Sequence, residues 1–170
     1  MSSTRQRAML YSDREHCLAV AGRTVVSFSL QPPSPGFLRA WAAAMDRLAQ
    51  QSSEPISALT VIDSSARVPD DAAKADIRNT VLRHQKQMCA LAYVIEGQGF
   101  TAAAMRSAIS FISLLGRYPF PQKTFANIAG ATAWTMQQLP TEGSMGASAV
   151  ELISVLEAMR RQLARVAVAG

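Results

Sequence analysis

Short apolar runs alternate along this chain with longer stretches in which apolar residues recur at helical spacing. The run at 56–62, Ile-Ser-Ala-Leu-Thr-Val-Ile, is rich in β-branched residues and predicts a strand covered on both faces. The run at 88–95 is almost entirely apolar and predicts a second central strand. A weaker apolar run predicts a last strand at 124–128.

A hairpin is predicted before these strands. Apolar segments at 16–20 and 24–30 flank Ala21-Gly22-Arg23, in which the glycine suits a tight turn. The second segment alternates apolar residues with Ser27 and Ser29. We therefore expect its apolar face to be buried and its serine face to be partly open to water.

Helices are predicted between the strands. Ser34 and Pro35 suit a helix start, and the apolar residues that follow recur at helical spacing over 35–51. Further helices are predicted over 70–86, 101–116 and 131–139. In the 101–116 helix we expect Met105, Ile109, Ile112 and Leu115 to fill the interface with the sheet. The apolar stripe of the first helix includes Trp41 and Met45, which we expect to pack on the sheet.

The order of these elements predicts a single α/β domain. Its mixed sheet has about five strands in the order β-β-α-β-α-β-α-β-α, with helices packed on it and an extra C-terminal amphipathic helix. We expect a flexible leader at 1–15, the α/β domain at 16–139, a linker at 140–147 and the last helix at 148–170.

The last helix has two different sides. Ser148 followed by Glu151 forms a capping box. The apolar stripe of this helix consists of Leu152, Leu156, Met159, Leu163 and Val166. Its opposite side carries Arg161, Gln162 and Arg165. We expect the stripe to pack on its own domain, because most apolar stripes do. An exposed stripe would instead favour self-association or a protein partner.

Composition narrows the possible functions. A chain of 170 residues, 49% hydrophobic, can form one domain with a real core. The net charge of +5 comes largely from arginines near both ends. This excess is modest, the basic residues are spread and the aromatics lie at core spacing, so we do not expect nucleic-acid binding.

The chain lacks the sequence features of secreted and membrane proteins. Cys17 and Cys89 do not resemble a secreted disulfide framework. Residues 1–15 lack the apolar core of a signal peptide, and no run is long enough for a membrane span. We expect a cytoplasmic protein.

The chain contains no convincing catalytic or metal-binding pattern. His16, Cys17, His84 and Cys89 lack the paired spacing of a zinc site, so no metal or cofactor is expected. We expect His84 at the surface and Cys89 as a small buried hydrophobe. The glycines of Gly97-Gln98-Gly99 are too few for a nucleotide fingerprint and suit a turn with positive φ.

The exit of the 56–62 strand is the first place to look for function. Asp63, Ser64 and Ser65 follow the strand directly, at the kind of edge where α/β proteins bind ligands and partners. A serine here could accept a phosphoryl group and gain roughly −1.5 to −2 charge. The alternative is that these side chains only satisfy N–H groups of a turn.

These residues and the element order resemble the STAS family, which comprises anti-sigma-factor antagonists and SpoIIAA-like or SEC14-like proteins. The resemblance covers about 16–139. It implies that a partner kinase switches one serine of the Asp-Ser-Ser segment, and the candidate is Ser65, or Ser64 in a shifted register. In that family the helix opens at once, whereas here Ala66-Arg67-Val68-Pro69 delays it.

We therefore predict a non-enzymatic regulatory or scaffold module that binds a protein partner. The first alternative is a module in which the 101–116 helix and the strand exits frame a pocket for a lipid or metabolite. An enzyme that uses Ser65 or Cys89 is a weaker third hypothesis.

Overall fold

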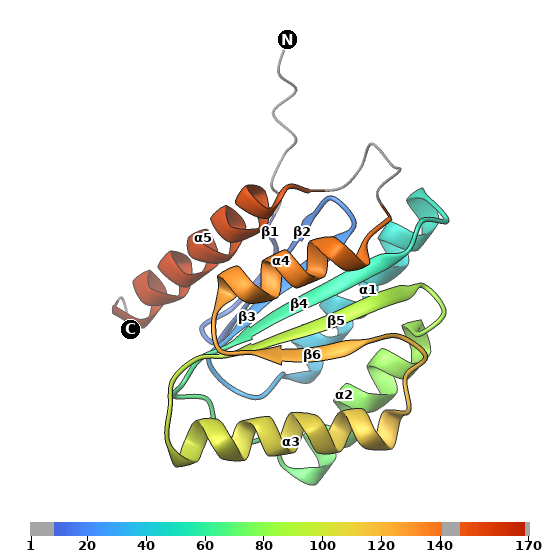
Figure 1. The fold of residues 1–170 in the computed structure, drawn as a ribbon. Coiled ribbons are helices and arrows are strands. Elements are labelled where there is room, and N and C mark those ends of the chain that lie inside the picture. Colours follow the sequence, from blue (N-terminus) through green and yellow to red (C-terminus); the bar gives the residue numbers. More distant parts are fainter. Residues whose placement is uncertain (1–8, 141–146, 169–170) are drawn as a thin grey trace.

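The computed structural model describes residues 9–140 and 147–168 (Figure 1). Most of the predicted linker, residues 141–146, and the first eight residues of the predicted leader lie outside the described residues. In the described part the chain forms one α/β domain, as predicted, in which helices cover both faces of a mixed sheet.

The sheet has six strands rather than five. They are β1 (Met9–Ser12), β2 (His16–Ala21), β3 (Thr24–Ser29), β4 (Ile56–Ile62), β5 (Met88–Ile95) and β6 (Gln122–Phe125). Their order in the sheet is their order in the chain. The pairs β1–β2 and β2–β3 are antiparallel, and the strands from β3 to β6 are parallel.

The additional strand corrects the predicted leader. β1 lies within 1–15 and pairs with β2, with Tyr11 opposite Leu18 and Ser12 opposite Cys17. It is a short edge strand whose residues are half-buried or exposed, so it lacks the apolar run that marks an interior strand.

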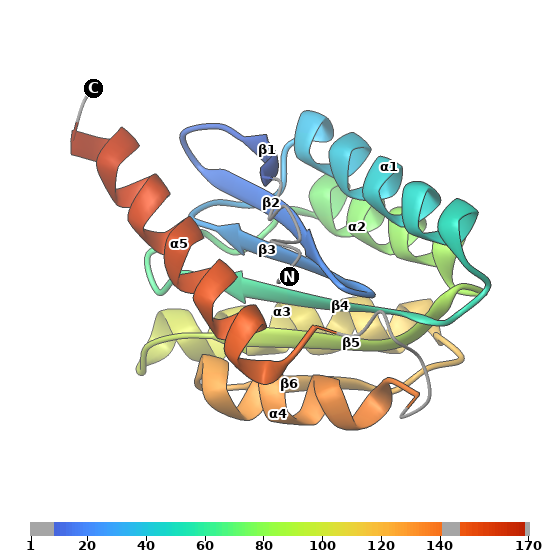
Figure 2. The same ribbon diagram turned by 90° about the horizontal axis from the view of Figure 1, so that it is seen from above.

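The helices lie in two layers (Figure 2). Helices α1 (Pro35–Gln51), α2 (Asp71–His84) and α3 (Phe100–Gly116) cover one face, and α4 (Ile128–Gln138) and α5 (Ala149–Val168) cover the other. The side chain of Ser34 caps α1, as predicted, by accepting a hydrogen bond of 3.1 Å from the Phe37 N–H.

The last parallel strand and the helix after it begin earlier than predicted. β6 begins at Gln122 and α4 at Ile128. The side chain of Asn127 caps α4 by accepting a hydrogen bond of 2.8 Å from the Gly130 N–H. The cap stops the strand, and this region was predicted less well because its apolar pattern is weak.

The serine face of β3 is also buried, contrary to the sequence prediction. Ser27 is 1% exposed and Ser29 is 5% exposed. β3 lies between β2 and β4, so the helical layer of α1–α3 covers this face as well. The Ser27 and Thr60 hydroxyls form a cross-strand hydrogen bond of 2.9 Å, which satisfies polar atoms that the sequence pattern placed near water.

The C-terminal helix belongs to the same core. Residues of α5 pack with those of β2, β3 and α4. Of the five residues of its predicted stripe, Leu152, Leu156, Met159 and Leu163 are at most 1% exposed, whereas Val166 is only half-buried. No helix in the described ranges is both long enough and apolar enough to span a bilayer.

Candidate functional site

The exit of β4 forms a tight polar turn. The Ser65 N–H and the Ser65 hydroxyl both donate to Asp63 Oδ2, at 2.8 and 2.6 Å. The Ala66 N–H donates to the Asp63 carbonyl at 3.1 Å, which closes the turn. Asp63 is half-buried, while Ser64 and Ser65 are exposed. The predicted site residues are thus adjacent and accessible.

The helix after this turn begins late, as predicted. α2 starts at Asp71, and the Asp70 carboxylate caps it by accepting a hydrogen bond of 2.8 Å from the Ala73 N–H. The serines therefore precede an irregular segment and do not sit at the positive end of a helix. A phosphoryl group on Ser65 would lie beside the Asp63 carboxylate, which accepts a hydrogen bond from the Ser65 hydroxyl.

The turn contacts the loop between β5 and α3. A Cβ placed on Gly97 would lie 2.8 Å from the Ser64 Cβ, and Gly97 has a φ of +87°. Gly99 has a φ of +93°. The prediction of positive φ for both glycines is confirmed, and the absence of a side chain at Gly97 allows the two loops to pack together.

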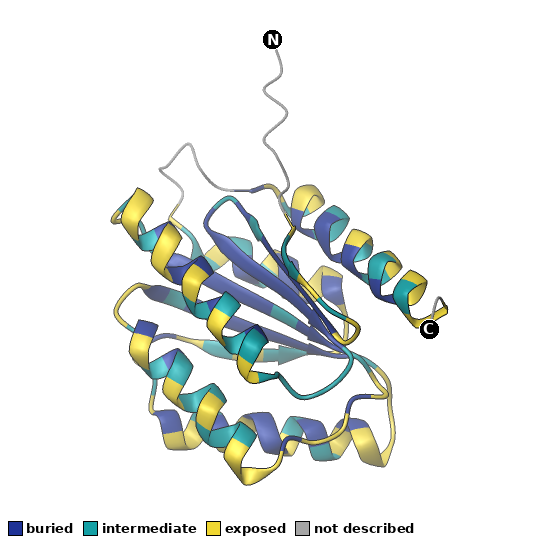
Figure 3. Cartoon of the chain, turned by 180° about the vertical axis from the view of Figure 1, so that it is seen from behind, coloured by how far each residue is buried: buried dark blue, intermediate teal, exposed yellow. Residues whose placement is uncertain are grey.

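Helix α3, which follows this loop, carries apolar residues on two sides. Its inner side, which includes Met105, Ile109 and Ile112, is buried as predicted. Its outer side is exposed (Figure 3). At 100° per residue the exposed apolar residues lie along one side, here called the α3 face; they are Phe100, Phe111, Leu114 and Leu115, with exposed fractions of 91, 50, 73 and 49%. Leu115 was predicted to pack inward and is half exposed instead.

Basic residues of α2 border the α3 face. Phe111 and Leu115 share a shallow groove with Lys74 and Arg78. The Lys74 ammonium lies 5.8 Å from the centroid of the Phe111 ring, within the range of a cation–π contact. Lys74 also pairs with Asp71 at 3.1 Å. The α3 face is thus bordered by charges of both signs, with basic residues in excess.

A second hollow lies between the first helical layer and the sheet. Its apolar walls include Phe37 and Trp41 from α1, Ile77 from α2, and Met105 and Ile109 from α3. Polar residues of its lining lie on the strands, at the loops after β3 and β4, and at Thr80 of α2. This arrangement fits the alternative prediction of a small-ligand pocket framed by the third helix and the strand exits.

The predicted interaction helix presents only part of its residues to solvent. Leu152, Leu156, Met159 and Leu163 are buried within the domain, while Arg161 and Arg165 are exposed. Sequence reasoning missed Arg160, whose guanidinium donates to both oxygens of Glu96, at 2.6 and 3.0 Å. The hydrogen bond and charge of Glu96 raise the pKa of Arg160 above its ordinary value. Glu96 is distant in sequence, so no local pattern indicates this pair.

Both histidines are buried, and the prediction of a surface position for His84 is wrong. His84 is 2% exposed; its Nε2 lies 3.0 Å from Asp46 Oδ1 and its Nδ1 lies 3.0 Å from the Thr80 carbonyl. Because Asp46 comes from α1, the tertiary fold supplies the polar partner that allows burial. Edge contact with Trp41 completes the packing.

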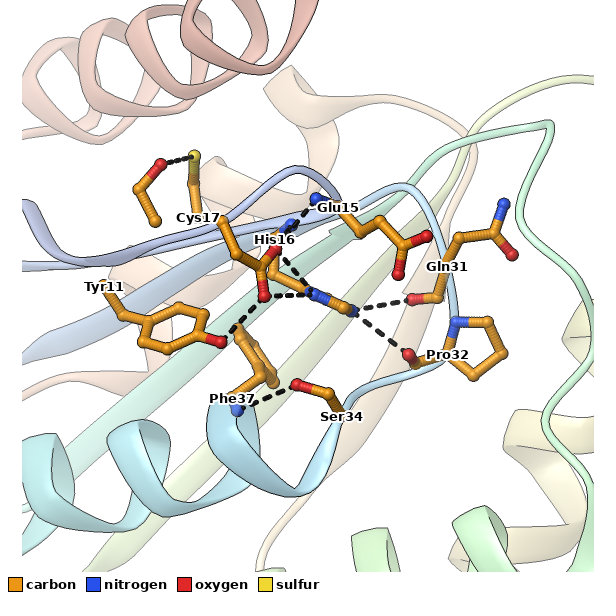
Figure 4. A network of polar contacts seen from close by, with 10 residues as sticks. Tyr11, Glu15, His16, Cys17, Gln31, Pro32, Ser34 and Phe37 are labelled. Atoms are coloured by element: carbon orange, nitrogen blue, oxygen red, sulfur yellow. Dashed lines mark hydrogen bonds and ion pairs between the residues drawn. The ribbon is translucent and has the colours of Figure 1, made fainter. Parts of the chain in front are cut away.

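His16 lies at the centre of a polar network at the start of β2 (Figure 4). Its Nδ1 is 3.1 Å from Asp13 Oδ1, and its Nε2 lies 3.2 and 3.1 Å from the carbonyls of Gln31 and Pro32. The Tyr11 hydroxyl donates to Asp13 Oδ2 at 2.7 Å. The network connects β1, β2 and the chain entering α1, and both ring nitrogens are already occupied by contacts inside the protein.

The cysteines are poor nucleophiles in this fold. Cys17 is fully buried and Cys89 is half-buried, so Cys89 is less enclosed than predicted. Burial raises the pKa of both thiols, which disfavours the reactive thiolate at neutral pH. In the described residues no group of three or more His, Cys, Asp or Glu side chains could hold a metal ion.

Comparisons of the chain with protein-family models, with curated proteins and with solved structures found no match.

Proposed function

We propose that this protein is a non-enzymatic interaction module that binds a protein partner through the α3 face. The observation that carries the proposal is the exposure of Phe100, Phe111 and Leu114 along one side of a helix whose other side is core. A helix that is apolar all round is normally covered on all sides. Phe111 and Leu114, with Leu115, are clustered near the end of α3, and Phe100 lies on the same side near its start. Exposed apolar residues clustered in this way are typical of binding surfaces.

The chemistry of the surface defines the partner. The groove beside Phe111 is bordered by Arg78 and by Lys74, which pairs with Asp71 of the same groove. Its net charge is therefore positive, and an amphipathic helix with acidic residues beside its apolar stripe would complement it. The apolar stripe of the partner helix would cover the α3 face, and its carboxylates would lie beside the basic residues of α2. This partner is the occupant that we propose.

The serines of the β4 exit lie close to the α3 face, where a modification could regulate binding. Ser64 packs against Gly97, and Phe100 follows Gly97 by three residues, so the predicted contact residues lie near one end of the α3 face. A negative charge on Ser64 or Ser65 would repel an acidic partner. Partner switching of the kind that the STAS resemblance implies is part of this proposal.

A retention experiment with matched variants tests the proposal. The purified protein is immobilised and exposed to lysate from its native cell, and retained proteins are quantified by mass spectrometry. Phe111→Ser combined with Leu114→Ser removes two of the four exposed apolar residues of the α3 face. Val150→Ser combined with Val168→Ser is the control, because these valines are 75 and 89% exposed on α5.

We expect a partner that the wild type and the control retain at equal levels and the α3 variant loses. Equal retention by all three proteins would contradict the proposed surface. Sedimentation of the purified protein tests whether a second copy of this chain, rather than another protein, occupies the α3 face. Concentration-dependent dimerisation that the α3 variant abolishes would replace the heterologous partner with self-association.

A further inference from the structure

A largely apolar cavity lies between the sheet and helices α1, α2 and α3. About 80 Å³ of its volume is open to the centre of a water molecule. Since one water needs ~10–15 Å³ by this measure, the enclosed part of the cavity has room for about five to eight waters, and the remainder opens to solvent. Its walls are largely apolar and include the aromatic rings of Phe37 and Trp41. An apolar hollow with a few polar groups is the usual form of a ligand site.

Two hydroxyls on the sheet side of this cavity lack partners. Tyr93 and Ser29 both line the cavity and are 6 and 5% exposed. Neither side chain forms a hydrogen bond within residues 9–140 and 147–168, whereas Thr60, also in the lining, is satisfied by Ser27. The Tyr93 hydroxyl is protonated at neutral pH, and burial raises its pKa further. A buried hydroxyl of this kind is satisfied by an oxygen of water or of a ligand.

The loop end of the cavity carries a positive charge. Arg67 lines the cavity and is otherwise exposed. Its Nε donates to Gln31 Oε1 at 3.0 Å, which joins the loop after β4 to the loop after β3. Of the carboxylates that the structure describes, none forms an ion pair with Arg67. Its terminal N–H groups remain free for an anion, and a carboxylate suits their planar geometry.

We propose that this cavity binds a small carboxylic acid with an apolar body and a second oxygen at its far end. The carboxylate pairs with Arg67, the body lies among Phe37, Trp41 and Ile109, and the second oxygen accepts a hydrogen bond from the Tyr93 hydroxyl. This site is separate from the α3 face, because its lining uses the inner side of α3.

The probe for this proposal is 4-hydroxyphenylacetate, whose carboxylate and phenolic oxygen lie at opposite ends of an apolar ring. Phenylacetate lacks the second oxygen, and 4-hydroxyphenylacetamide lacks the charge. Binding is located by the emission of Trp41 in a Trp134→Phe background, because Trp134 packs on the opposite face of the sheet. Affinities are measured by calorimetry for the same three probes.

We expect saturable binding of 4-hydroxyphenylacetate, with Arg67→Gln and the amide probe each weakening it by about tenfold. The preference for acid over amide should disappear in Arg67→Gln and persist in Arg83→Gln, an exposed arginine of α2 outside the cavity. Tyr93→Phe should remove a preference of about two- to tenfold for 4-hydroxyphenylacetate over phenylacetate.

Three results would overturn the proposal. The first is the absence of a saturable change in Trp41 emission with any probe. The second is an acid preference that survives Arg67→Gln, and the third is a hydroxyl preference that survives Tyr93→Phe. The combined substitution of Phe111 and Leu114 by serine should leave probe binding unchanged, so this test is independent of the proposed partner surface.

Discussion

The Asp13 carboxylate organises the N-terminal edge of the domain. It accepts hydrogen bonds from the Tyr11 hydroxyl and from the N–H groups of Glu15 and His16, at 2.7, 2.8 and 2.7 Å. Burial raises the pKa of Asp13, but the Tyr11 hydroxyl, the backbone N–H groups and the charge of His16 together hold it below its ordinary value. The folded protein therefore binds a proton at Asp13 less readily than the unfolded chain does.

This difference predicts a pH dependence of stability. The contribution of Asp13 is complete above the unfolded-state pKa of about 4 and is lost as the pH falls through the lower folded-state value. We expect Asp13→Asn to lower the unfolding free energy at neutral pH by about 1 kcal/mol. It should also flatten the loss of stability below about pH 4. Urea denaturation at several pH values measures both effects.

Asp71→Asn is the matched control, because it removes the same charge from a carboxylate whose side chain is 99% exposed. It should keep the wild-type pH profile below the ordinary Asp pKa. An Asp13→Asn protein with that same wild-type profile would show that the network contributes nothing to acid stability.

The serines of the β4 exit provide a second prediction at this scale. Ser64→Asp combined with Ser65→Asp adds two negative charges near the end of the α3 face. We expect it to weaken binding of an acidic partner by roughly 1 kcal/mol, and more at low salt. Alanine at both positions should bind as the wild type does. Calorimetry at two ionic strengths measures the difference.

Ser53→Asp adds a charge at the entry of β4 rather than at its exit and should leave affinity unchanged. If alanine and aspartate at positions 64 and 65 bind the partner equally, a phosphoryl switch at this turn is wrong.

The sequence predicted single-residue roles well where they depend on neighbours in the chain. Ser34, Gly97 and the capping box of Ser148 with Glu151 all act as local chemistry predicts. It failed where a distant partner decides the outcome. His84 is buried because α1 supplies Asp46, and no local pattern could indicate that contact.

Arg23 shows the same limit at a turn. It was predicted in a hairpin turn and is 2% exposed. Its guanidinium donates to the Leu48 carbonyl at 2.7 Å and to the carbonyls of Ser52 and Glu54, so it satisfies the C-terminal end of α1. A charged residue beside a glycine normally predicts a solvated turn. Arg23 is buried instead, because the fold places the end of α1 beside it.

At the scale of elements, interior strands and long helices were predictable and edges were not. β4, β5 and α1 have the predicted bounds because burial on defined faces fixes their apolar period. β1 and β6 are short strands at the two edges of the sheet, where one side has no neighbouring strand and the pattern weakens.

Helix α5 is held to the sheet by its apolar stripe and by one polar anchor. Arg160 pairs with Glu96, and its guanidinium lies 5.2 Å from the centroid of the Phe28 ring. A truncation that removes residues 141–170 would also remove core residues such as Leu156 and Met159, so it tests folding before it tests interaction.

The Arg160–Glu96 anchor can be tested without truncation. We expect Arg160→Ala to lower the unfolding free energy by about 1 kcal/mol, since the pair is bidentate but partly exposed. Glu96→Gln should cost a similar amount, and the two changes together should cost less than their sum. Denaturation of the four proteins gives the coupling energy.

Arg161→Ala is the control from the adjacent, exposed position and should change stability little. Equal effects of Arg160→Ala and Arg161→Ala would show that the pair does not anchor α5.

At the scale of the whole molecule, the two helical layers differ in what they leave exposed. The layer of α4 and α5 buries apolar residues against the sheet, and the outer side of α5 carries charged residues. The layer of α1, α2 and α3 leaves the α3 face open and encloses the cavity. The pattern of α3 alone could not show this, because a helix with apolar residues on two sides equally fits a central buried helix.

The central claim is that the α3 face binds a protein partner, and calorimetry of that partner with matched variants tests it most directly. We predict that Phe111→Ser combined with Leu114→Ser lowers affinity at least tenfold, because central apolar residues dominate binding energy. Val150→Ser combined with Val168→Ser should retain wild-type affinity. Equal affinities for the wild type and both variants would contradict the claim.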